Sequence, residues 1–402
     1  MMNDACGFVQ RGRAGRLLDM SQQSLPTIRA GVPAIAKAVY HAIRFVAHDP
    51  AVFITIPGQR SILIIRDVEL QRAKQHAKAD RVYTPKDFTP ASGLSGDREI
   101  ATAQASAECL RRHAVRRVAG DRSLPLVYVE MLREVGVEVV LDPELGVADR
   151  RRKDDAEVEH LRQAQRDTES VIRMACELIR HATARHNGDL EHEGELLTSE
   201  RVKTLIDLHL LKLGYANGES IVAGGPIGAD CHHPGAGVLR TGEPVIIDVF
   251  PQNKTTLYHG DCTRMTIHGD VPPMVSRMLT MVREAKQAAE RATRAGVTGD
   301  SVHHATVNVL KAHGVHIGFP SANAPGDLIF LPHGTGHGLG IDLKEPPLLD
   351  FNGVELVSGD AVTIEPAVYC SAIGGVRIED LYVVRDGGCD NLGGLPETID
   401  EW

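Results

Sequence analysis

The sequence predicts a two-part α+β protein, in which a larger domain over residues 151–402, built from two related halves, follows a smaller α/β domain over residues 1–150. Three observations predict this organisation. The first 150 residues hold apolar runs separated by Gly and Pro, a pattern typical of alternating strands and helices. The charged run RRKDDAE at residues 151–157 marks a domain boundary. Beyond it, the order helix, helix, strands occurs twice, which indicates a duplicated unit with pseudo-two-fold symmetry.

The composition excludes several classes of protein. Of the 402 residues, 43% are hydrophobic and 24% are charged, which is ordinary for a globular protein. The net charge of -9 comes without a basic stripe, so we expect no nucleic acid partner. No run approaches the roughly 18 apolar residues of a spanning helix, so we expect no membrane attachment and a cytoplasmic location. The seven cysteines are scattered and form no CxxC pair, which is typical of reduced thiols.

The smaller domain contains four apolar runs that predict strands or helix–strand pairs. They are AVFITIP (51–57), SILIIRDVEL (61–70), PLVYVEML (125–132) and VEVVLD (137–142). An α/β layer is the simplest way to bury them. The runs are not followed by a phosphate-binding GxGxxG or GxxxxGK[ST] loop, so the sequence predicts no nucleotide site here and does not reveal what this domain does.

In the larger domain, apolar positions at three- and four-residue spacings predict a long amphipathic helix from Asp155 to Ala182. A second helix begins at an N-cap, either Thr198 or Ser199, and ends before Gly214. The second half repeats this order with helices at 272–295 and 300–313. The expected strands are IVAGG, PVIIDVF and DCTRMTIHG in the first half, and AVTIEPAVY and VRIEDLYVV in the second.

Acidic residues occupy matching places in the two halves. The strand acids Asp248 and Glu365 each lie six residues after a glycine. Each is followed by an acid in the next strand, Asp261 after 13 residues and Glu379 after 14. A hairpin in each half would place its two carboxylates side by side. We therefore expect four carboxylates to meet near the pseudo-two-fold axis.

Buried carboxylates need cationic partners, because an unpaired charge in an apolar strand costs more than a hydrogen bond returns. Arg264 and Arg377 lie in the same strands and are one candidate source of positive charge. Two arginines do not neutralise four converging carboxylates, whereas two divalent metal ions do. His337 in HGTGHGLG would add an imidazole nitrogen to the set. Four oxygen donors and one nitrogen, without a thiolate, favour two manganese ions per chain, with cobalt, iron(II) or zinc as alternatives.

These motifs resemble the signatures of a known family. The series IDVFPQNKTTLYHGDCTRM, HGTGHGLG, TIEPAVY and GVRIED, within residues 151–386, is similar to the creatinase/prolidase/methionine-aminopeptidase superfamily, and closest in type to Xaa-Pro aminopeptidases and dipeptidases. The resemblance implies the pita-bread fold, a dinuclear metal centre and a homodimer. The first 150 residues resemble the N-terminal domain of these enzymes in size and placement only.

Carried over residue by residue, the resemblance assigns five metal ligands. Asp248 and Asp261 would hold one ion, with Asp261 bridging to the second. His337 and Glu365 would hold that second ion, with Glu379 as the other bridge. Glu365 would also move a proton from the attacking water to the leaving nitrogen.

The resemblance also assigns residues around the substrate. His333 would border the substrate, and His232 or His233 would bind the substrate or the oxyanion; spacing favours His232 without deciding. Arg377 would orient Glu379 and is counted among the substrate-binding residues. Lys344 stands where these peptidases usually have a histidine. An ammonium group is only a donor, so Lys344 would bind an oxyanion or a substrate carboxylate rather than shift protons.

The expected function is a dinuclear metal-dependent hydrolase that cleaves Xaa-Pro bonds with a water activated between the two ions. The expected partner is thus a peptide or small-molecule substrate. One alternative is a pita-bread enzyme acting on a small C–N or C–S substrate, as creatinase-like and dimethylsulfoniopropionate-lyase-like relatives do. The other is a catalytically inactive binding homologue. The complete ligand set favours an enzyme, and Val249 and Phe250 stand where the lyases show an extra acid.

Overall fold

The computed structural model describes residues 25–402, which form two compact units with the break between Leu145 and Gly146. The break falls shortly before the boundary expected from the charged run. Helix α5 (Ala148–Arg151) belongs to the larger unit because its arginines pair with acids there. Arg150 Nη1 lies 3.3 Å from Glu345 Oε2, and Arg151 Nη2 lies 2.7 Å from Asp360 Oδ2. Cys6 and the first 24 residues of the expected smaller domain lie outside the described residues.

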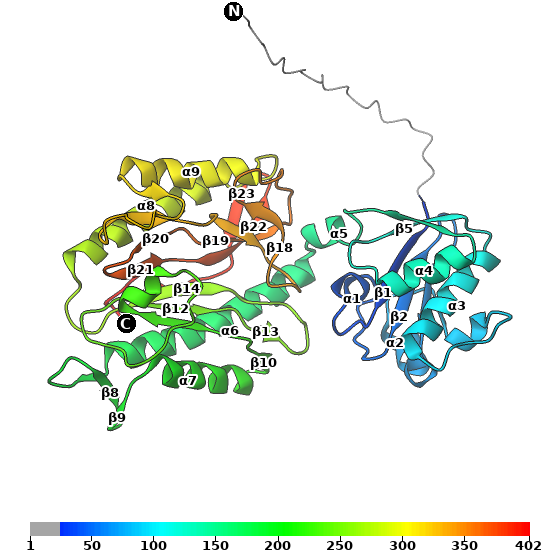
Figure 1. The fold of residues 1–402 in the computed structure, drawn as a ribbon, viewed down its shortest axis with the longest axis horizontal. Coiled ribbons are helices and arrows are strands. Elements are labelled where there is room, and N and C mark those ends of the chain that lie inside the picture. Colours follow the sequence, from blue (N-terminus) through cyan, green and yellow to red (C-terminus); the bar gives the residue numbers. More distant parts are fainter. Residues whose placement is uncertain (1–24) are drawn as a thin grey trace, which may run out of the picture. The chain divides into compact units, whose positions relative to one another are not determined.

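The smaller unit is a six-stranded mixed sheet with helices on both faces, in the order β4-β3-β2-β1-β5-β6 (Figure 1). Alternate side chains of a strand point to opposite faces. Val52 and Ile54 therefore pack with α3 (Arg98–Arg112) and α4 (Leu126–Glu134), whereas Ala51 and Phe53 pack with α1 (Lys37–Ile43) and α2 (Leu70–His76). The predicted α/β layer is therefore present, and the runs at 125–132 and 137–142 form one of the expected helix–strand pairs, α4 followed by β6.

The elements of this unit are β1 (Thr27–Gly31), α1 (Lys37–Ile43), β2 (Ala51–Thr55), β3 (Ile62–Ile65), the short 3-10 helix η1 (Asp67–Glu69), α2 (Leu70–His76), β4 (Arg81–Tyr83), η2 (Pro85–Phe88), α3 (Arg98–Arg112), β5 (Arg117–Gly120), α4 (Leu126–Glu134) and β6 (Glu138–Leu141).

In the larger unit the strands lie between two helix pairs, α6 with α7 and α8 with α9 (Figure 1). The predicted helices are confirmed: α6 (Asp155–Arg180), α7 (Ser199–Lys212), α8 (Pro273–Ala292) and α9 (Gly299–Ala312). Thr198, rather than Ser199, is the N-cap of α7, and its hydroxyl accepts the Arg201 N–H at 3.2 Å. None of the helices within residues 25–402 is long and apolar enough to cross a membrane.

Three sheets form the centre of this unit. The first half contributes β11-β12-β14, and the second contributes β18-β17-β19-β22-β23 and β15-β16-β20-β21. Their strands are β11 (Ile221–Gly224), β12 (Val245–Val249), β14 (Cys262–Thr266), β15 (His316–Ile317), β16 (Ile329–Leu331), β17 (Gly336–Gly338), β18 (Glu345–Leu349), β19 (Ala361–Ile364), β20 (Ala367–Cys370), β21 (Gly374–Arg377), β22 (Asp380–Arg385) and β23 (Gly388–Asn391). Shorter pieces are β7 (Thr183–Ala184), β8 (Leu190–His192), β9 (Glu195–Leu196), β10 (Tyr215–Ala216), β13 (Gln252–Asn253) and η3 (Gly225–Ala229).

The expected hairpin of the second half is present but interrupted at the acids: β19 pairs antiparallel with β22 and β20 with β21, in a register that places Glu365 opposite Glu379. The first half also has its expected hairpin, with β12 antiparallel to β14. In the second half the run AVTIEPAVY is broken into β19 and β20, which belong to different sheets. Pro366 follows Glu365 at the break, and a proline has no N–H to donate to a strand ladder. Glu379 likewise falls between β21 and β22, so both acids lie where the chain passes from one sheet to another.

Two apolar clusters determine which way the first acidic strand faces. Val245, Ile247 and Val249 of β12 pack against α6 and α7, whereas Ile246 packs in the cluster around α8. Asp248 lies on the same face of β12 as Ile246, because side chains alternate along a strand. Burial of the odd-numbered residues therefore directs the Asp248 carboxylate toward the second half.

Candidate metal centre

The first two acids come from neighbouring strands. Asp248 is paired in register with Thr263 of β14, and Asp261 immediately precedes that strand. Both side chains are buried, with residue exposures of 8% for Asp248 and 3% for Asp261. Since an isolated buried carboxylate is costly, each needs a partner of opposite charge or several donors.

His337 is brought to these acids by close backbone packing around β17. A Cβ on Gly336 would lie 2.0 Å from Thr363 O, and one on Gly338 would lie 2.3 Å from Glu345 O, so only glycine fits at either position. The His337 Nδ1 lies 3.1 Å from Gly338 O, which turns Nε2 toward the carboxylates. That Nε2 lies 3.7 Å from Asp261 Oδ2 and 3.5 Å from Glu365 Oε1. Burial lowers the pKa of His337 to about 4, so its imidazole is neutral and can donate a lone pair.

The acids of both halves meet at this imidazole. Asp261, His337 and Glu379 each present one ligand atom within 4.8 Å of the others. Burial raises the pKa of Asp261 and of Glu379, and the charges of neighbouring carboxylates raise both further. Burial also raises the pKa of Glu365. Without a cation, the fold therefore holds these carboxylates at an electrostatic cost.

The hydrogen bonds of Asp248 also indicate that the site needs a cation. Its Oδ2 accepts a hydrogen bond of 2.7 Å from Arg377 Nη2, whereas its Oδ1 is buried and has no hydrogen-bond partner among the described residues. A buried acceptor left without a partner costs about 1–3 kcal/mol. Divalent ions bound by the four carboxylates and His337 would satisfy this oxygen and neutralise the others, so the residues present fit a metal centre.

The contacts of Arg377 differ from the sequence prediction that it orients Glu379 directly. It does not reach Glu379 directly: its Nε lies 3.2 Å from Thr263 Oγ1, and that hydroxyl donates to Glu379 Oε2 at 2.7 Å. Its Nη1 donates to Tyr369 Oη at 2.9 Å. The sequence analysis did not single out Thr263 and Tyr369, although each follows a predicted ligand at an even spacing, Thr263 two residues after Asp261 and Tyr369 four residues after Glu365.

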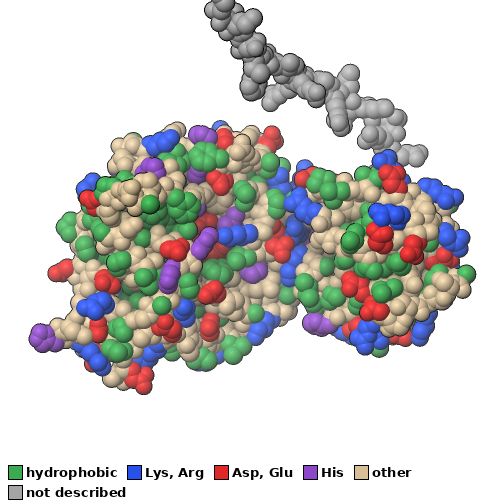
Figure 2. All heavy atoms as spheres, viewed as in Figure 1, with side chains coloured by type: hydrophobic (Ala, Val, Ile, Leu, Met, Phe, Trp, Pro, Cys, Tyr) green, Lys and Arg blue, Asp and Glu red, His purple; other side chains and the backbone are tan. Residues whose placement is uncertain are grey.

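A cavity of about 420 Å³ opens beside the residues predicted to bind metal. Figure 2 shows histidine and acidic side chains together on this face of the larger unit, next to basic ones. The sequence-predicted residues that line the cavity are His232, Asp248, Asp261, His333, His337, Lys344, Glu365, Arg377 and Glu379. Further lining residues that the sequence analysis did not consider include Glu219, Leu343, Leu348 and Asp350.

The histidines around the cavity have different surroundings. His333 Nε2 lies 2.9 Å from Tyr369 Oη, and burial lowers the pKa of this histidine. His232 lines the cavity, whereas His233 is not among the described lining residues. The His233 Nδ1 instead accepts the Gly235 N–H at 3.0 Å.

Comparison with known proteins points to one family. The model of the family described as "Metallopeptidase family M24" matches residues 159–386. The chain is 33% identical over 181 residues to a Mycobacterium tuberculosis protein named "Probable dipeptidase PepE", a match that covers 44% of this chain and 45% of that protein. It is 22% identical over 348 residues to the Xaa-Pro dipeptidase of Pyrococcus horikoshii, covering 85% of this chain and 86% of that protein. The match to the mycobacterial protein thus spans less than half of that relative's length.

Solved structures resemble the described fold over most of its length. The X-Pro aminopeptidase from Thermotoga maritima superposes with a TM-score of 0.75 at 20% identity, covering 93% of this chain and 96% of that one. The Xaa-Pro dipeptidase from Bacillus anthracis gives a TM-score of 0.74 at 20% identity, covering 93% and 94%. These matches confirm the pita-bread fold preceded by a smaller α/β domain.

Proposed function

Because this chain belongs to metallopeptidase family M24, we propose that it is a hydrolase of Xaa-Pro peptide bonds that uses two divalent metal ions. The ligands would be Asp248, Asp261, His337, Glu365 and Glu379. The observation that carries the proposal is the convergence of three buried carboxylates, the less buried Glu365 and a neutral imidazole on one cavity, where Asp248 Oδ1 has no hydrogen-bond partner within residues 25–402. Relatives named Xaa-Pro dipeptidase support the choice of substrate.

The bound ions would lower the pKa of a water molecule and polarise the scissile carbonyl. Oxygen-rich ligands favour manganese for this role, with cobalt, iron(II) or zinc as alternatives. Glu365 is the residue we assign to proton transfer, from the water to the leaving nitrogen. Its side chain is 19% exposed, against 10% for His337 and 5% for Asp261, so it is the most open of these three ligands.

Other residues of the cavity would bind the substrate. We assign His232 rather than His233 to substrate binding, since only His232 lines the cavity. His333 would border the substrate with its ring held by Tyr369. Arg377 already donates to Asp248, Thr263 and Tyr369, so we assign it to holding the ligands rather than to the substrate.

A direct test is a hydrolysis screen on protein stripped with a chelator and reloaded with manganese. The panel would contain Ala-Pro, Ala-Pro-Ala, Ala-Ala, Met-Ala-Ser, creatine and dimethylsulfoniopropionate. We expect turnover of Ala-Pro or Ala-Pro-Ala only after reloading, with Ala-Ala inert. Turnover of creatine or dimethylsulfoniopropionate alone would favour the second candidate, an enzyme for a small C–N or C–S substrate, which the cationic Lys344 in the cavity wall also suits. Sedimentation of the same sample would check the expected homodimer.

Lys344 is predicted to recognise the free carboxylate of a dipeptide substrate. It lines the cavity, its side chain is exposed, and no hydrogen bond or ion pair is assigned to it within residues 25–402. A hydrogen bond to a charged group contributes about 1.5–3 kcal/mol, so Lys344→Ala should raise KM for Ala-Pro roughly tenfold or more. It should leave KM for the amidated Ala-Pro nearly unchanged, because that substrate has no carboxylate. Steady-state kinetics on both substrates measures the difference.

The control for this prediction is Lys254→Ala, because Lys254 is also exposed but does not line the cavity. Lys344→His provides a second comparison, since it restores the residue usual in the resembled peptidases and should raise activity if the lysine limits proton transfer. Equal changes in KM for the acid and the amide would contradict carboxylate recognition.

A further inference from the structure

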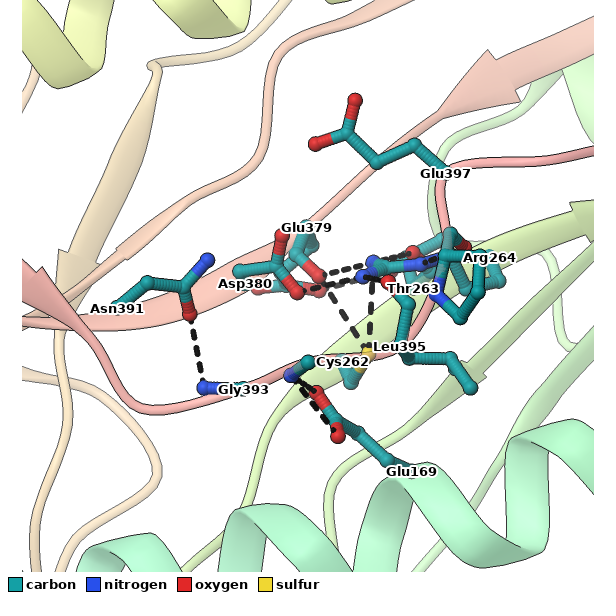
Figure 3. Close-up of polar contacts among 12 residues, drawn as sticks. Glu169, Cys262, Thr263, Arg264, Glu379, Asp380, Asn391, Gly393, Leu395 and Glu397 are labelled. Carbon is teal, nitrogen blue, oxygen red and sulfur yellow. Dashed lines mark hydrogen bonds and ion pairs between the residues drawn. The ribbon is translucent and has the colours of Figure 1, made fainter.

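A buried polar network lies behind the metal ligands, with Arg264 at its centre (Figure 3). Arg264 follows Thr263 in β14 and is 1% exposed. Successive side chains of a strand point to opposite faces, so Arg264 points away from the cavity side that Thr263 faces. The network is therefore separate from the ligands in the cavity, yet shares their strands.

One end of the Arg264 guanidinium holds the joint between the two halves. At this joint Thr263 and Glu379 form an isolated β-bridge, in which Glu379 N–H donates to Thr263 O at 3.2 Å. The Arg264 Nη1 donates both to Thr263 O, at 2.9 Å, and to Glu379 O, at 2.7 Å. A single nitrogen thus ties the strand that follows Asp261 to the segment that carries Glu379.

The other end of the guanidinium holds the last residues of the chain. Its Nη2 donates to Asp380 Oδ1 and to Leu395 O, both at 2.6 Å, and its Nε donates to Pro396 O at 2.9 Å. The five N–H groups of an arginine therefore all have acceptors here. A lysine has three donors on one atom and cannot reach this set.

The remaining acids of the network have partners of their own. Asp380 Oδ2 lies 2.7 Å from Lys286 Nζ, and Glu169 of α6 accepts the Gly394 N–H at 2.9 Å. Glu169, Cys262 and Asp380 come within 4.8 Å of one another, as metal ligands would. Both oxygens of Asp380 are already bound to cations, so this cluster is a structural network rather than a second metal site.

We propose that Arg264 is a positioning residue for the metal centre. By clamping the carbonyls of Thr263 and Glu379 from behind, it sets the separation between Asp261 and Glu379, and thereby the affinity of the site for metal. The proposal rests on the metal centre of the proposed function. It adds that the network around Arg264, including residues 393–397, helps to determine the affinity of the site for metal.

Three variants test this proposal, with metal binding as the main readout. Arg264→Lys keeps the charge next to Asp380 but loses the fork of donors. The double variant Arg264→Met with Asp380→Leu removes both charges together, which a buried pair often tolerates, and also loses the clamp. Arg180→Met is the control, because Arg180 also donates to backbone carbonyls, those of Ile267, Gly269 and Asp400, away from the ligands. Circular dichroism of each variant reports whether it is folded.

We expect manganese affinity, measured by titration calorimetry, to fall about 10- to 100-fold in both Arg264 variants. The visible spectrum of the cobalt-loaded variants should also change, because it reports ligand geometry. Arg180→Met should match the wild type in both measurements. A folded Arg264 variant with wild-type affinity and spectrum would overturn the proposal, and so would failure of both variants to fold, since Arg264 would then serve the fold as a whole. If the wild type binds no metal, the proposed function itself fails.

Discussion

Asparagine at position 261 should abolish retention of manganese and lower kcat/KM for an Xaa-Pro substrate at least about a thousandfold, which is ~4 kcal/mol of transition-state stabilisation. Asp261 lies between the two halves, 3.7 Å from His337 Nε2 and among the ligand atoms grouped with Glu379. In Asp261→Asn the amide cannot take over the bridging role proposed for this carboxylate, because it carries no charge and has only one acceptor oxygen. Loss of this residue should therefore remove the centre rather than weaken one contact.

The same substitution should leave the metal-free protein at least as stable as the wild type. Removing one of several buried like charges relieves repulsion that Arg377 and Lys344 balance only in part, since the pKa of Asp261 stays raised despite their positive charges. Elemental analysis after manganese reconstitution and urea unfolding in a chelator measure the two effects. The matched control is Glu219→Gln, which changes another carboxylate of the cavity wall outside the ligand group. Close to two ions per chain in Asp261→Asn would contradict the ligand assignment.

Methionine at position 377 should destabilise the metal-free protein by about 3–5 kcal/mol, because it leaves the buried Asp248 carboxylate without its cation. The Arg377 side chain is 4% exposed and lies 2.7 Å from Asp248 Oδ2. With manganese bound, the ions supply positive charge next to Asp248. The loss in unfolding free energy caused by Arg377→Met should therefore be clearly smaller in manganese than in chelator.

Urea unfolding under the two conditions measures this difference. The control is Arg240→Met, which breaks an arginine–aspartate pair of similar length, 2.8 Å to Asp189, whose arginine is 48% exposed. An exposed pair contributes less than about 1 kcal/mol, and its loss should not depend on the metal. Equal destabilisation of Arg377→Met in manganese and in chelator would show that Asp248 does not bind metal.

The helices of the larger unit could be predicted because their signals are local. The apolar stripe of α6 and the cap at Thr198 depend on residues a few positions apart. The predicted ends of these helices differ from the observed ones by a few residues at most. The run at 125–132 had no such signal, since Val and Tyr suit a strand as well as a buried helix, and packing against α3 made it helical.

The acids of the candidate site could also be identified from the sequence, but the details of their strand pairing and of their hydrogen bonds could not. A carboxylate within an apolar strand is conspicuous wherever the strand lies, so Asp248 was identified without knowledge of its neighbours. The expected hairpin of Glu365 and Glu379 is present, but the sequence did not show that the strand ladder is interrupted at these acids, where the chain passes between two sheets. The sequence predicts that Arg377 orients Glu379, and in the structure this contact runs through Thr263. Strand alternation places Arg377 and Glu379 on one face, but it does not show that Thr263, more than 100 residues away, lies between them.

By itself the sequence determined the order of the elements, the duplication and the residues that crowd negative charge around His337, because each of these depends on short-range spacing and on the cost of burying a charge. Only the tertiary structure decided which cation partners which acid. Arg377 lies at Asp248, and Arg264, also considered from the sequence as a partner of the strand acids, lies instead behind the joint of Thr263 with Glu379. The physical reason is that these contacts join segments brought together by packing of the two halves, and a hydrogen bond across 100 or more residues leaves no pattern in either segment alone.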